Sequence, residues 1–130
     1  MTEQVHITLV VELSRWIENH LGRAIQLPEL AAYSGYSLWY MQKVFKEISG
    51  YSLGRYIRER RLMGALRKLR FSEQSLFDIA IDFGFGSQSH FCYMFKKRFG
   101  FTPSELRSSP ALPVTVTLTP PLHEQLPQAA

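Results

Sequence analysis

The chain carries one sequence pattern twice, in residues 30–53 and again in residues 79–103. Each copy has an apolar residue followed by alanine, a Gly-aromatic pair, a Phe-Lys pair and a Gly-aromatic-hydroxyl triplet. In the first copy these are Leu30-Ala31, Gly35-Tyr36, Phe45-Lys46 and Gly50-Tyr51-Ser52; in the second they are Ile79-Ala80, Gly84-Phe85, Phe95-Lys96 and Gly100-Phe101-Thr102. The offset is 49 residues before the turn and 50 after it, because Gly86 adds one residue. A helix, a glycine-containing turn and a second helix form a helix-turn-helix unit, so the duplication predicts two such units.

The positive charge of the chain is concentrated in this repeated region. Residues 36–107 hold thirteen basic and six acidic side chains, a balance of +7, whereas residues 1–35 hold two basic and four acidic ones. A phosphate-binding surface requires such a balance, but many domains simply carry solvated Arg and Lys side chains. The 130 residues, 45% of them hydrophobic, are enough for one domain or two very small ones with real cores.

Several classes of protein and site are disfavoured by the composition. A single cysteine, Cys92, excludes an intrachain disulfide and gives no cysteine-rich metal pattern. No apolar run approaches the roughly 20 residues that span a bilayer, and the first residues lack the features of a secretory signal. We therefore expect a cytoplasmic protein with no membrane association, no metal and no cofactor.

Helical spacing, end caps and glycine stops predict an all-α fold of about seven helices. Ser37 is expected to cap the third helix and Ser52 the fourth, while Ser75 and Thr102 open capping boxes at the fifth and seventh. The fourth helix is basic and joins the two repeats. We predict four regions: a first helix-turn-helix subdomain in residues 1–51, a linker helix in residues 52–70, a second helix-turn-helix subdomain in residues 71–107, and a Pro-rich tail in residues 108–130.

The tail differs in composition from the rest of the chain. Five of the seven prolines fall in residues 110–127, around a stretch at residues 114–119 in which apolar residues alternate with threonine. Alternation is typical of a strand, but one strand without a partner cannot fold alone. We therefore expect a flexible or loosely docked tail.

The third predicted helix, about residues 37–49, has two faces of different chemistry. The face expected in the core is apolar: Leu38, Met41, Phe45 and Ile48. The opposite face carries an aromatic ring and three polar side chains: Trp39, Gln42, Lys43 and Lys46. Glutamine can form two hydrogen bonds with adenine, lysine can reach guanine or a phosphate, and an aromatic ring can pack on a thymine methyl. Tryptophan is commonly a core residue, but the position of Trp39 opposite Phe45 favours exposure.

The sixth predicted helix, about residues 87–99, repeats the inward positions with Phe91, Met94 and Phe95. Its outward and N-terminal positions carry smaller or less basic groups: Gln88, Ser89, His90, Cys92, Tyr93 and Lys96. Ser, Cys and Tyr lack the paired donors that discriminate bases best. We therefore expect the sixth helix mainly to position the protein and the third to supply most of the sequence selectivity.

With these motifs the chain resembles the AraC/XylS family of transcription regulators, and within it the small stand-alone MarA/SoxS/Rob-like branch. The resemblance covers about residues 8–107. The segments that carry it are Gly35–Lys46, Gly50–Arg58, Ile79-Ala80 through Gly84-Phe85, and Ser87–Gly100 followed by Thr102-Pro103. A doubled pattern of this length is very specific.

The resemblance implies two helix-turn-helix subdomains bridged by the fourth helix, with both recognition helices inserted into adjacent major grooves. It implies base contacts from Trp39, Gln42 and Lys43 in the first recognition helix and from Gln88 and Ser89 in the second. Tyr93, like Lys43, stands where the branch has arginine, and we expect it to face the bases too. The residues expected to contact phosphates are Ser37, Tyr40, Lys46, Arg55, Arg58, Ser87, Lys96 and Lys97.

We therefore expect a sequence-specific, DNA-binding transcription regulator that binds double-stranded promoter DNA. A fourth helix of roughly 16 residues would be about 24 Å long, comparable with the roughly 34 Å between successive major grooves on one side of DNA. Since each chain carries two readers, we expect it to bind as a monomer. The resemblance implies an activator that meets RNA polymerase, with no small-molecule effector domain.

Two functions of other classes remain open from the residues. The first is a protein interaction module that uses Trp39, Tyr40 and Tyr93 and has lost specific DNA reading. The second is an enzyme with Cys92 as nucleophile and His90 as base. Residues two apart on a helix point about 200° from one another, so this pair would not meet, and we expect no catalytic residues.

Overall fold

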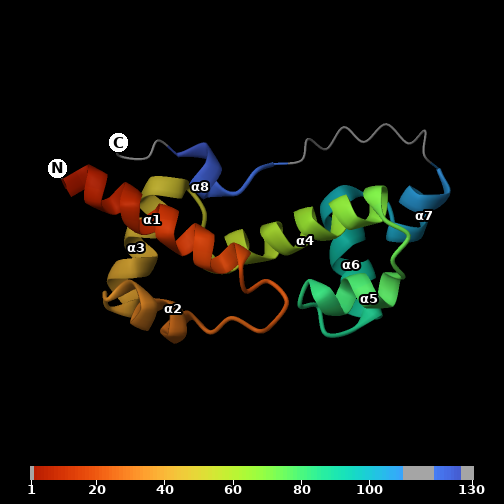
Figure 1. Cartoon of the computed structure of the whole chain (residues 1–130), viewed down its shortest axis with the longest axis horizontal. Helices are drawn as coiled ribbons and strands as arrows, with labels where there is room; N and C mark the ends of the chain where they lie inside the picture. Colours follow the sequence, from red (N-terminus) through yellow and green to blue (C-terminus); the bar gives the residue numbers. More distant parts are fainter. Residues whose placement is uncertain (1, 110–118, 127–130) are drawn as a thin grey trace. The chain divides into compact units, whose positions relative to one another are not determined.

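The computed structural model describes residues 2–109 and 119–126, and this part of the chain contains helices and no strand (Figure 1). The helices are α1 (Thr2–Glu18), α2 (Leu27–Ser34), α3 (Leu38–Ser49), α4 (Leu53–Phe71), α5 (Leu76–Asp82), α6 (Gln88–Phe99), α7 (Pro103–Ser108) and α8 (Leu122–Gln125). The all-α prediction is confirmed. Helix α8 was not predicted, and residues 114–118 of the alternating stretch lie outside the described residues.

The helices divide into two compact units. The first unit comprises Met1–Arg60 and Pro120–Ala130, and the second comprises Arg61–Thr119. The boundary falls inside α4, because the two halves of this helix contribute to different cores. Leu53, Tyr56 and Ile57 belong to the first core, and Leu62, Ala65, Leu66 and Leu69 belong to the second. The predicted linker helix is therefore also a core element of both units.

The core of the first unit forms where α3 packs beside α1 (Figure 1). Met41 and Phe45 of α3 are fully buried, as the apolar spacing predicts. Leu38 differs from the prediction because 38% of it is exposed. It is the first residue of α3, and helical side chains lean toward the N-terminus, which leaves part of Leu38 outside the core.

The core of the second unit contains several aromatic rings beside its aliphatic residues. Phe91 and Phe95 of α6 are fully buried, and their ring centroids lie 5.7 Å apart. Phe95 also contacts Phe99 at 4.7 Å and Phe101 at 5.8 Å between ring centroids. Such pairs contribute about 0.5–1.5 kcal/mol each beyond their buried area. Phe99 at the end of α6 and Phe101 after it therefore extend this core beyond the buried part of the helix.

The two recognition helices begin with the same kind of cap, and the one at Ser37 was predicted. The N–H of Tyr40 donates to Ser37 Oγ across 3.2 Å, and the N–H of His90 donates to Ser87 Oγ across 3.1 Å. The turn before α3 needs one left-handed glycine, Gly35 with φ 78°, whereas the turn before α6 has two, Gly84 and Gly86, with φ 78° and 79°. Because glycine has no Cβ, the second turn accommodates its extra residue at little steric cost.

Helix α8 returns the chain to the first unit and packs on α1 (Figure 1). Leu122 is only 6% exposed, and its N–H donates to the Tyr56 hydroxyl across 3.0 Å. The buried Ser14 hydroxyl lies 2.9 Å from the Tyr56 hydroxyl and accepts from the N–H of His123 across 3.0 Å. Burial raises the pKa of Tyr56, which keeps its hydroxyl neutral. The part of the tail at residues 119–126 is thus held by specific hydrogen bonds.

A charged pair joins the end of α1 to the middle of α4. Arg60 Nε and Nη2 donate to Glu18 Oε1 and Oε2 across 2.9 and 2.8 Å. Burial acts to lower the pKa of Arg60, but the hydrogen bond and charge of Glu18 outweigh it and the pKa is raised. The guanidinium therefore stays charged, and this two-point contact fixes the geometry of the two helices within the first unit.

Candidate nucleic-acid interface

The outward face of α3 displays the residues that were predicted to read bases. Trp39 is 68% exposed, and Gln42, Lys43 and Lys46 are exposed with it. Met41 and Phe45 lie on the opposite, buried side of the same helix. The prediction that Trp39 is exposed rather than part of the core is confirmed. An exposed indole beside an amide and two ammonium groups has the chemistry of a base-reading surface.

Trp39 and Lys43 form one composite group on this face. The Nζ of Lys43 lies 5.1 Å from the centroid of the indole, one helical turn further along. A cation over an aromatic face at an exposed site gains about 0.5–1 kcal/mol. In the chain alone, this contact therefore already holds a flat apolar ring and a positive charge side by side.

Tyr40 is half-buried, and its hydroxyl is held by a residue that the sequence did not single out. His6 Nε2 of α1 lies 2.8 Å from the Tyr40 hydroxyl oxygen, and the two rings meet edge to face. A phosphate oxygen can only accept, so Tyr40 can donate to a phosphate only when His6 Nε2 carries a proton and donates to Tyr40. The 34 residues between the partners leave no local sequence signal for this contact.

Two further predicted phosphate contacts lie on the half of α4 that belongs to the first unit. Arg55 and Arg58 are both exposed, and the guanidinium carbon of Arg55 lies 5.2 Å from the centroid of Tyr51. Ser37 is exposed and uses its hydroxyl as the α3 cap. The first unit therefore contains a cluster of predicted base and phosphate contacts on α3 and basic side chains on α4.

Helix α6 exposes its predicted contact residues in the second unit. Tyr93 is 63% exposed, and the N-terminal residues Ser87, Gln88 and Ser89 are exposed as well. The predicted phosphate residues Lys96 and Lys97 are also exposed. All predicted contact residues of α3 and α6 except the half-buried Tyr40 are thus on the surface, and their contacts with DNA stay predictions.

Two side chains modify the outward face of α6. Lys97 Nζ lies 5.9 Å from the centroid of Tyr93, which makes a second aromatic–lysine pair. Cys92 lies partly buried at the edge of the face, and burial raises the pKa of its thiol. Its sulfur is therefore neutral at physiological pH and is not an activated nucleophile.

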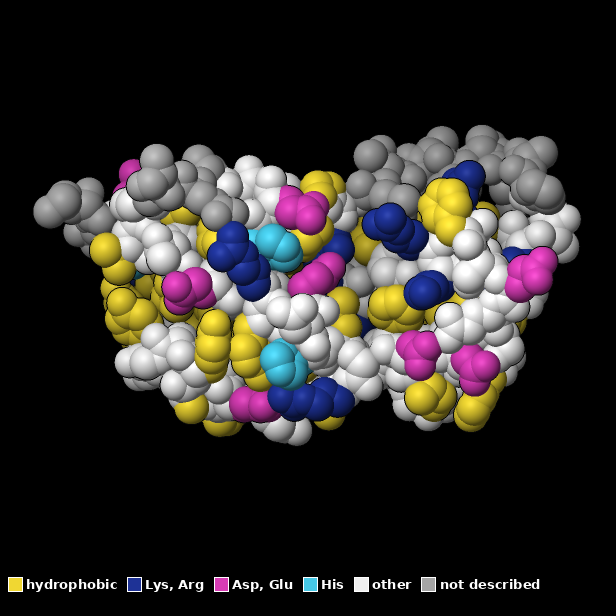
Figure 2. All heavy atoms as spheres, viewed as in Figure 1, with side chains coloured by type: hydrophobic (Ala, Val, Ile, Leu, Met, Phe, Trp, Pro, Cys, Tyr) yellow, Lys and Arg dark blue, Asp and Glu magenta, His cyan; other side chains and the backbone are white. Residues whose placement is uncertain are grey.

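A different kind of surface lies on α5, and sequence reasoning did not single it out. Phe77 and Ile81, one helical turn apart, are 55% and 43% exposed, and the acidic residues Asp78 and Asp82 are exposed beside them. Figure 2 shows hydrophobic and acidic side chains together in the region of α5. The carboxylates repel phosphate, so this face suits a protein rather than DNA.

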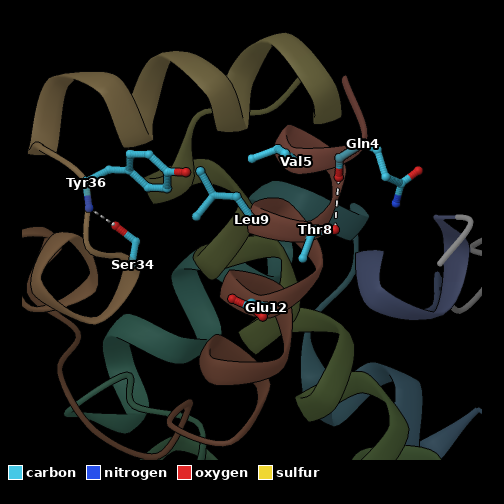
Figure 3. A pocket seen from close by; sticks show the side chains of 7 residues that line it. All are labelled: Gln4, Val5, Thr8, Leu9, Glu12, Ser34 and Tyr36. Carbon is cyan, nitrogen blue, oxygen red and sulfur yellow. Dashed lines mark hydrogen bonds between the residues drawn. The ribbon is translucent and has the colours of Figure 1, made fainter. Parts of the chain in front are cut away.

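A hollow of about 300 Å³ lies in the first unit between α1 and the turn that precedes α3 (Figure 3). It is lined by Gln4, Val5, Thr8, Leu9, Glu12, Ser34 and Tyr36. Thr8 Oγ1 already donates to the Gln4 carbonyl, and the N–H of Tyr36 donates to Ser34 Oγ. The lining has a carboxylate and no cation, so it does not extend the phosphate-binding surface.

Two features of the described residues, 2–109 and 119–126, bear on other functions. No group of three or more His, Cys, Asp or Glu side chains there could hold a metal ion. Among the same residues, no helix has the length and apolar character needed to cross a membrane.

Comparison with known proteins gives relatives over most of the chain. A family model described as a helix-turn-helix domain matches residues 30–109. "Regulatory protein SoxS" of Escherichia coli K12 is 40% identical over 102 residues, which cover 78% of this chain and 95% of SoxS. "Probable transcription factor PqrA" of Proteus vulgaris is 39% identical over 109 residues, which cover 82% of this chain and 89% of PqrA.

Solved structures agree with the sequence relatives. An AraC-type transcriptional regulator from Chromobacterium violaceum superposes with a TM-score of 0.74 at 27% identity, covering 82% of this chain and 95% of that one. The DNA-binding domain of AdpA, solved with a target DNA, has the same fold, with a TM-score of 0.72 at 24% identity over 77% of this chain and 90% of that domain. The doubled helix-turn-helix, the identity with SoxS and PqrA and the match to an AraC-type structure lead to one conclusion: the chain belongs to the AraC/XylS family of transcription regulators, in its small MarA/SoxS/Rob-like branch.

Proposed function

We propose that this DNA-binding transcription regulator binds promoter DNA as a monomer, with α3 and α6 in adjacent major grooves. The observation that carries the proposal is the exposed Trp39 with Gln42, Lys43 and Lys46 on the side of α3 opposite the buried Met41 and Phe45. A second recognition helix within the same chain supplies the second reading surface. One chain then suffices for an asymmetric site of two major-groove segments.

In the first unit, α3 supplies the stronger sequence selectivity. Gln42 forms two hydrogen bonds with an adenine, Lys43 reaches guanine O6 and N7, and Trp39 packs on a thymine methyl. Each well-placed paired contact contributes about 1–3 kcal/mol of discrimination against the wrong base. The phosphate contacts of α3 and α4 fix the register of this helix on the duplex without reading sequence.

We propose that α4 is the linker between the two readers. It is an unbroken helix of 19 residues, and each of its halves is buried in one of the two cores. Where the grooves of the DNA do not match the protein, the DNA bends, which costs a few kcal/mol.

We propose RNA polymerase as the protein partner of an activator. The partner must use a surface that the DNA leaves uncovered, and the acidic and apolar face of α5 is one such surface. The exposed side chains of Phe77 and Ile81 offer apolar area that a partner would bury, and the carboxylates of Asp78 and Asp82 favour a basic partner. Alanine at both Phe77 and Ile81 should lower transcription activation in a reconstituted assay while leaving DNA affinity unchanged.

The proposal also covers catalysis and location. The chain acts without catalysis, since Cys92 has a raised pKa and sits two residues from His90 on one helix, where the two side chains diverge. The relatives come from bacteria, whose chromosomal DNA lies in the cytoplasm, and we place the chain there.

Selection of bound DNA from a random pool tests the proposed function. The whole chain should select a site with two conserved segments, and its affinity should fall steeply as salt rises. The double substitution Trp39→Ala and Gln42→Ala should reduce the preference for the selected site at least tenfold and leave the fold intact. Lys96→Ala should weaken binding to all sequences about equally and lower the salt slope by about 1.

The outcomes separate this function from the alternative. Unchanged selectivity in the double variant would show that α3 does not read bases. A chain with no selected site and no salt-dependent affinity would instead be an interaction module built on the same fold.

A further inference from the structure

The two recognition helices differ most at the centre of their outward faces. With the offset of 50 residues, Tyr93 of α6 stands at the position of Lys43 in α3. Both positions point away from the buried phenylalanines of their own helix. The first unit therefore presents an ammonium group where the second unit presents an aromatic ring that is 63% exposed.

The neighbours of Tyr93 make this part of α6 less polar than its counterpart. Ser89 stands at the position of Trp39, and Cys92, a neutral thiol, stands at that of Gln42. Neither side chain carries the paired donors or acceptors that identify adenine or guanine. The exposed ring of Tyr93 is thus the largest group available at the centre of the face.

Lys97 fixes the way in which this ring is presented. Its Nζ lies 5.9 Å from the ring centroid, so the cation covers one aromatic face. The contact also keeps the ammonium group of Lys97 close to α6, and a DNA phosphate next to this helix could form an ion pair with it. Since 63% of Tyr93 is exposed, much of the residue is available for an apolar contact.

We propose that Tyr93 makes the second unit a reader of 5-methylpyrimidines, which in an unmodified operator means thymine. The 5-methyl group is the apolar feature that a base pair presents in the major groove, and an exposed aromatic ring is its natural partner. This inference rests on the proposed function, because it requires α6 to lie in a major groove. It adds a base preference: the second half-site contains a thymine opposite Tyr93, whereas the first is read through the hydrogen bonds of Gln42 and Lys43 together with the contact of Trp39 on a thymine methyl.

Thymine-to-uracil exchange tests this contact, because it removes only the methyl group. The whole chain binds the selected duplex in competition with duplexes that carry deoxyuridine at one thymine of the second half-site. At one position the exchange should weaken binding about fourfold, the equivalent of burying one methylene-sized group. A second pair of duplexes carries a C·G pair at that position, with either cytosine or 5-methylcytosine. The duplex with 5-methylcytosine should bind more tightly than the one with cytosine, by a similar factor.

Three variants identify the side chain responsible. Tyr93→Ala should make the chain indifferent to the methyl group, while Tyr93→Phe should keep the fourfold effect, because the ring rather than the hydroxyl makes the contact. Trp39→Ala is the matched control from the first unit and should also keep the effect in the second half-site. Tyr93→Arg should move the preference at this position to guanine.

Failure of this inference is distinguishable from failure of the proposed function. If the chain selects a two-part site but binds uracil and thymine equally throughout the second half-site, or selects no thymine there, Tyr93 is not a methyl reader and DNA reading by α3 still stands. Loss of the methyl effect in Tyr93→Phe would overturn the assignment to the aromatic ring, because the effect would then require the hydroxyl. Absence of any selected site would overturn the proposed function itself.

Discussion

The two units share their inward residues and differ in their outward ones. Phe45 and Phe95 are equivalent and are both fully buried, and Met41 and Phe91 are a second buried pair. The exposed faces have diverged at the equivalent pairs Trp39 and Ser89, Gln42 and Cys92, and Lys43 and Tyr93. The core positions decide whether a helix-turn-helix forms, and the outward positions decide what it reads. Duplication therefore preserved the packing while leaving the reading face free to change.

The units also complete their cores in different ways. The second unit uses its own consecutive segments, with aromatic rings from α6 and the turn that follows it. The first unit receives Leu122 from the far end of the chain, through the hydrogen bonds of Ser14 and Tyr56. The same pattern can thus be stabilised by local aromatic packing or by a segment that is distant in sequence.

The largest expected effect tests whether the two cores are independent. Phe45→Ala and Phe95→Ala should each destabilise their own unit by about 3–5 kcal/mol, because both rings are fully buried. Trp16 and Trp39 both lie in the first unit, so tryptophan fluorescence follows its unfolding. Amide hydrogen exchange in α6 follows the second unit. If Phe95→Ala shifts the fluorescence transition as much as Phe45→Ala does, the two units unfold as one.

A smaller effect tests the role of α8. Leu122→Ala should lower the free energy of unfolding of the first unit by about 2–3 kcal/mol, at the low end of the range for a buried leucine, because so short a helix can rearrange. Fluorescence-detected urea denaturation measures this change. Hydrogen exchange in α6 should stay as in the parent chain. An unchanged fluorescence midpoint would show that α8 docks without stabilising the first unit.

An alanine substitution at one glycine in each half of α4 compares the two halves of this helix directly. A Cβ at Gly64 would lie 2.3 Å from the Phe83 ring, whereas nothing lies within 4 Å of a Cβ at Gly54. Gly64→Ala should therefore cost about 1–3 kcal/mol through overpacking, while Gly54→Ala should stabilise by about 0.5–1 kcal/mol through helix propensity. Thermal denaturation of both variants checks the opposite signs. A stabilised Gly64→Ala would mean that Phe83 moves aside at no cost.

The smallest expected effect concerns the duplicated caps. Ser37→Ala and Ser87→Ala should each destabilise their unit by about 1 kcal/mol, because each hydroxyl accepts one otherwise unpaired N–H at a helix start. Denaturation followed by fluorescence and by hydrogen exchange measures each unit. The corresponding threonine variants are the controls and should restore most of the loss. A clear inequality between the two alanine variants would show that the capping chemistry has diverged along with the reading faces.

Local signals in the chain were sufficient for the helices and for the faces of α3 and α6. Serine caps, glycine turns and apolar residues three or four apart act within one or two helical turns, so they appear in the sequence. The exposure of Trp39 followed from its position opposite Phe45. Leu38 departed from the pattern because helical periodicity does not show that the first residue of a helix can stay partly outside the core.

Contacts between distant segments could not be predicted in this way. The Tyr40 hydroxyl is held by His6, 34 residues away, and Ser14 meets His123 across 109 residues. The hydrogen bonds of α8 exist only because α1 and α4 bring Ser14 and Tyr56 together. The sequence by itself determined the doubled helix-turn-helix and the chemistry of each outward face, since both arise from short-range spacing. Only the tertiary structure decided how each core is closed and which hydroxyls are already engaged, since burial and pairing depend on surfaces that no single segment possesses.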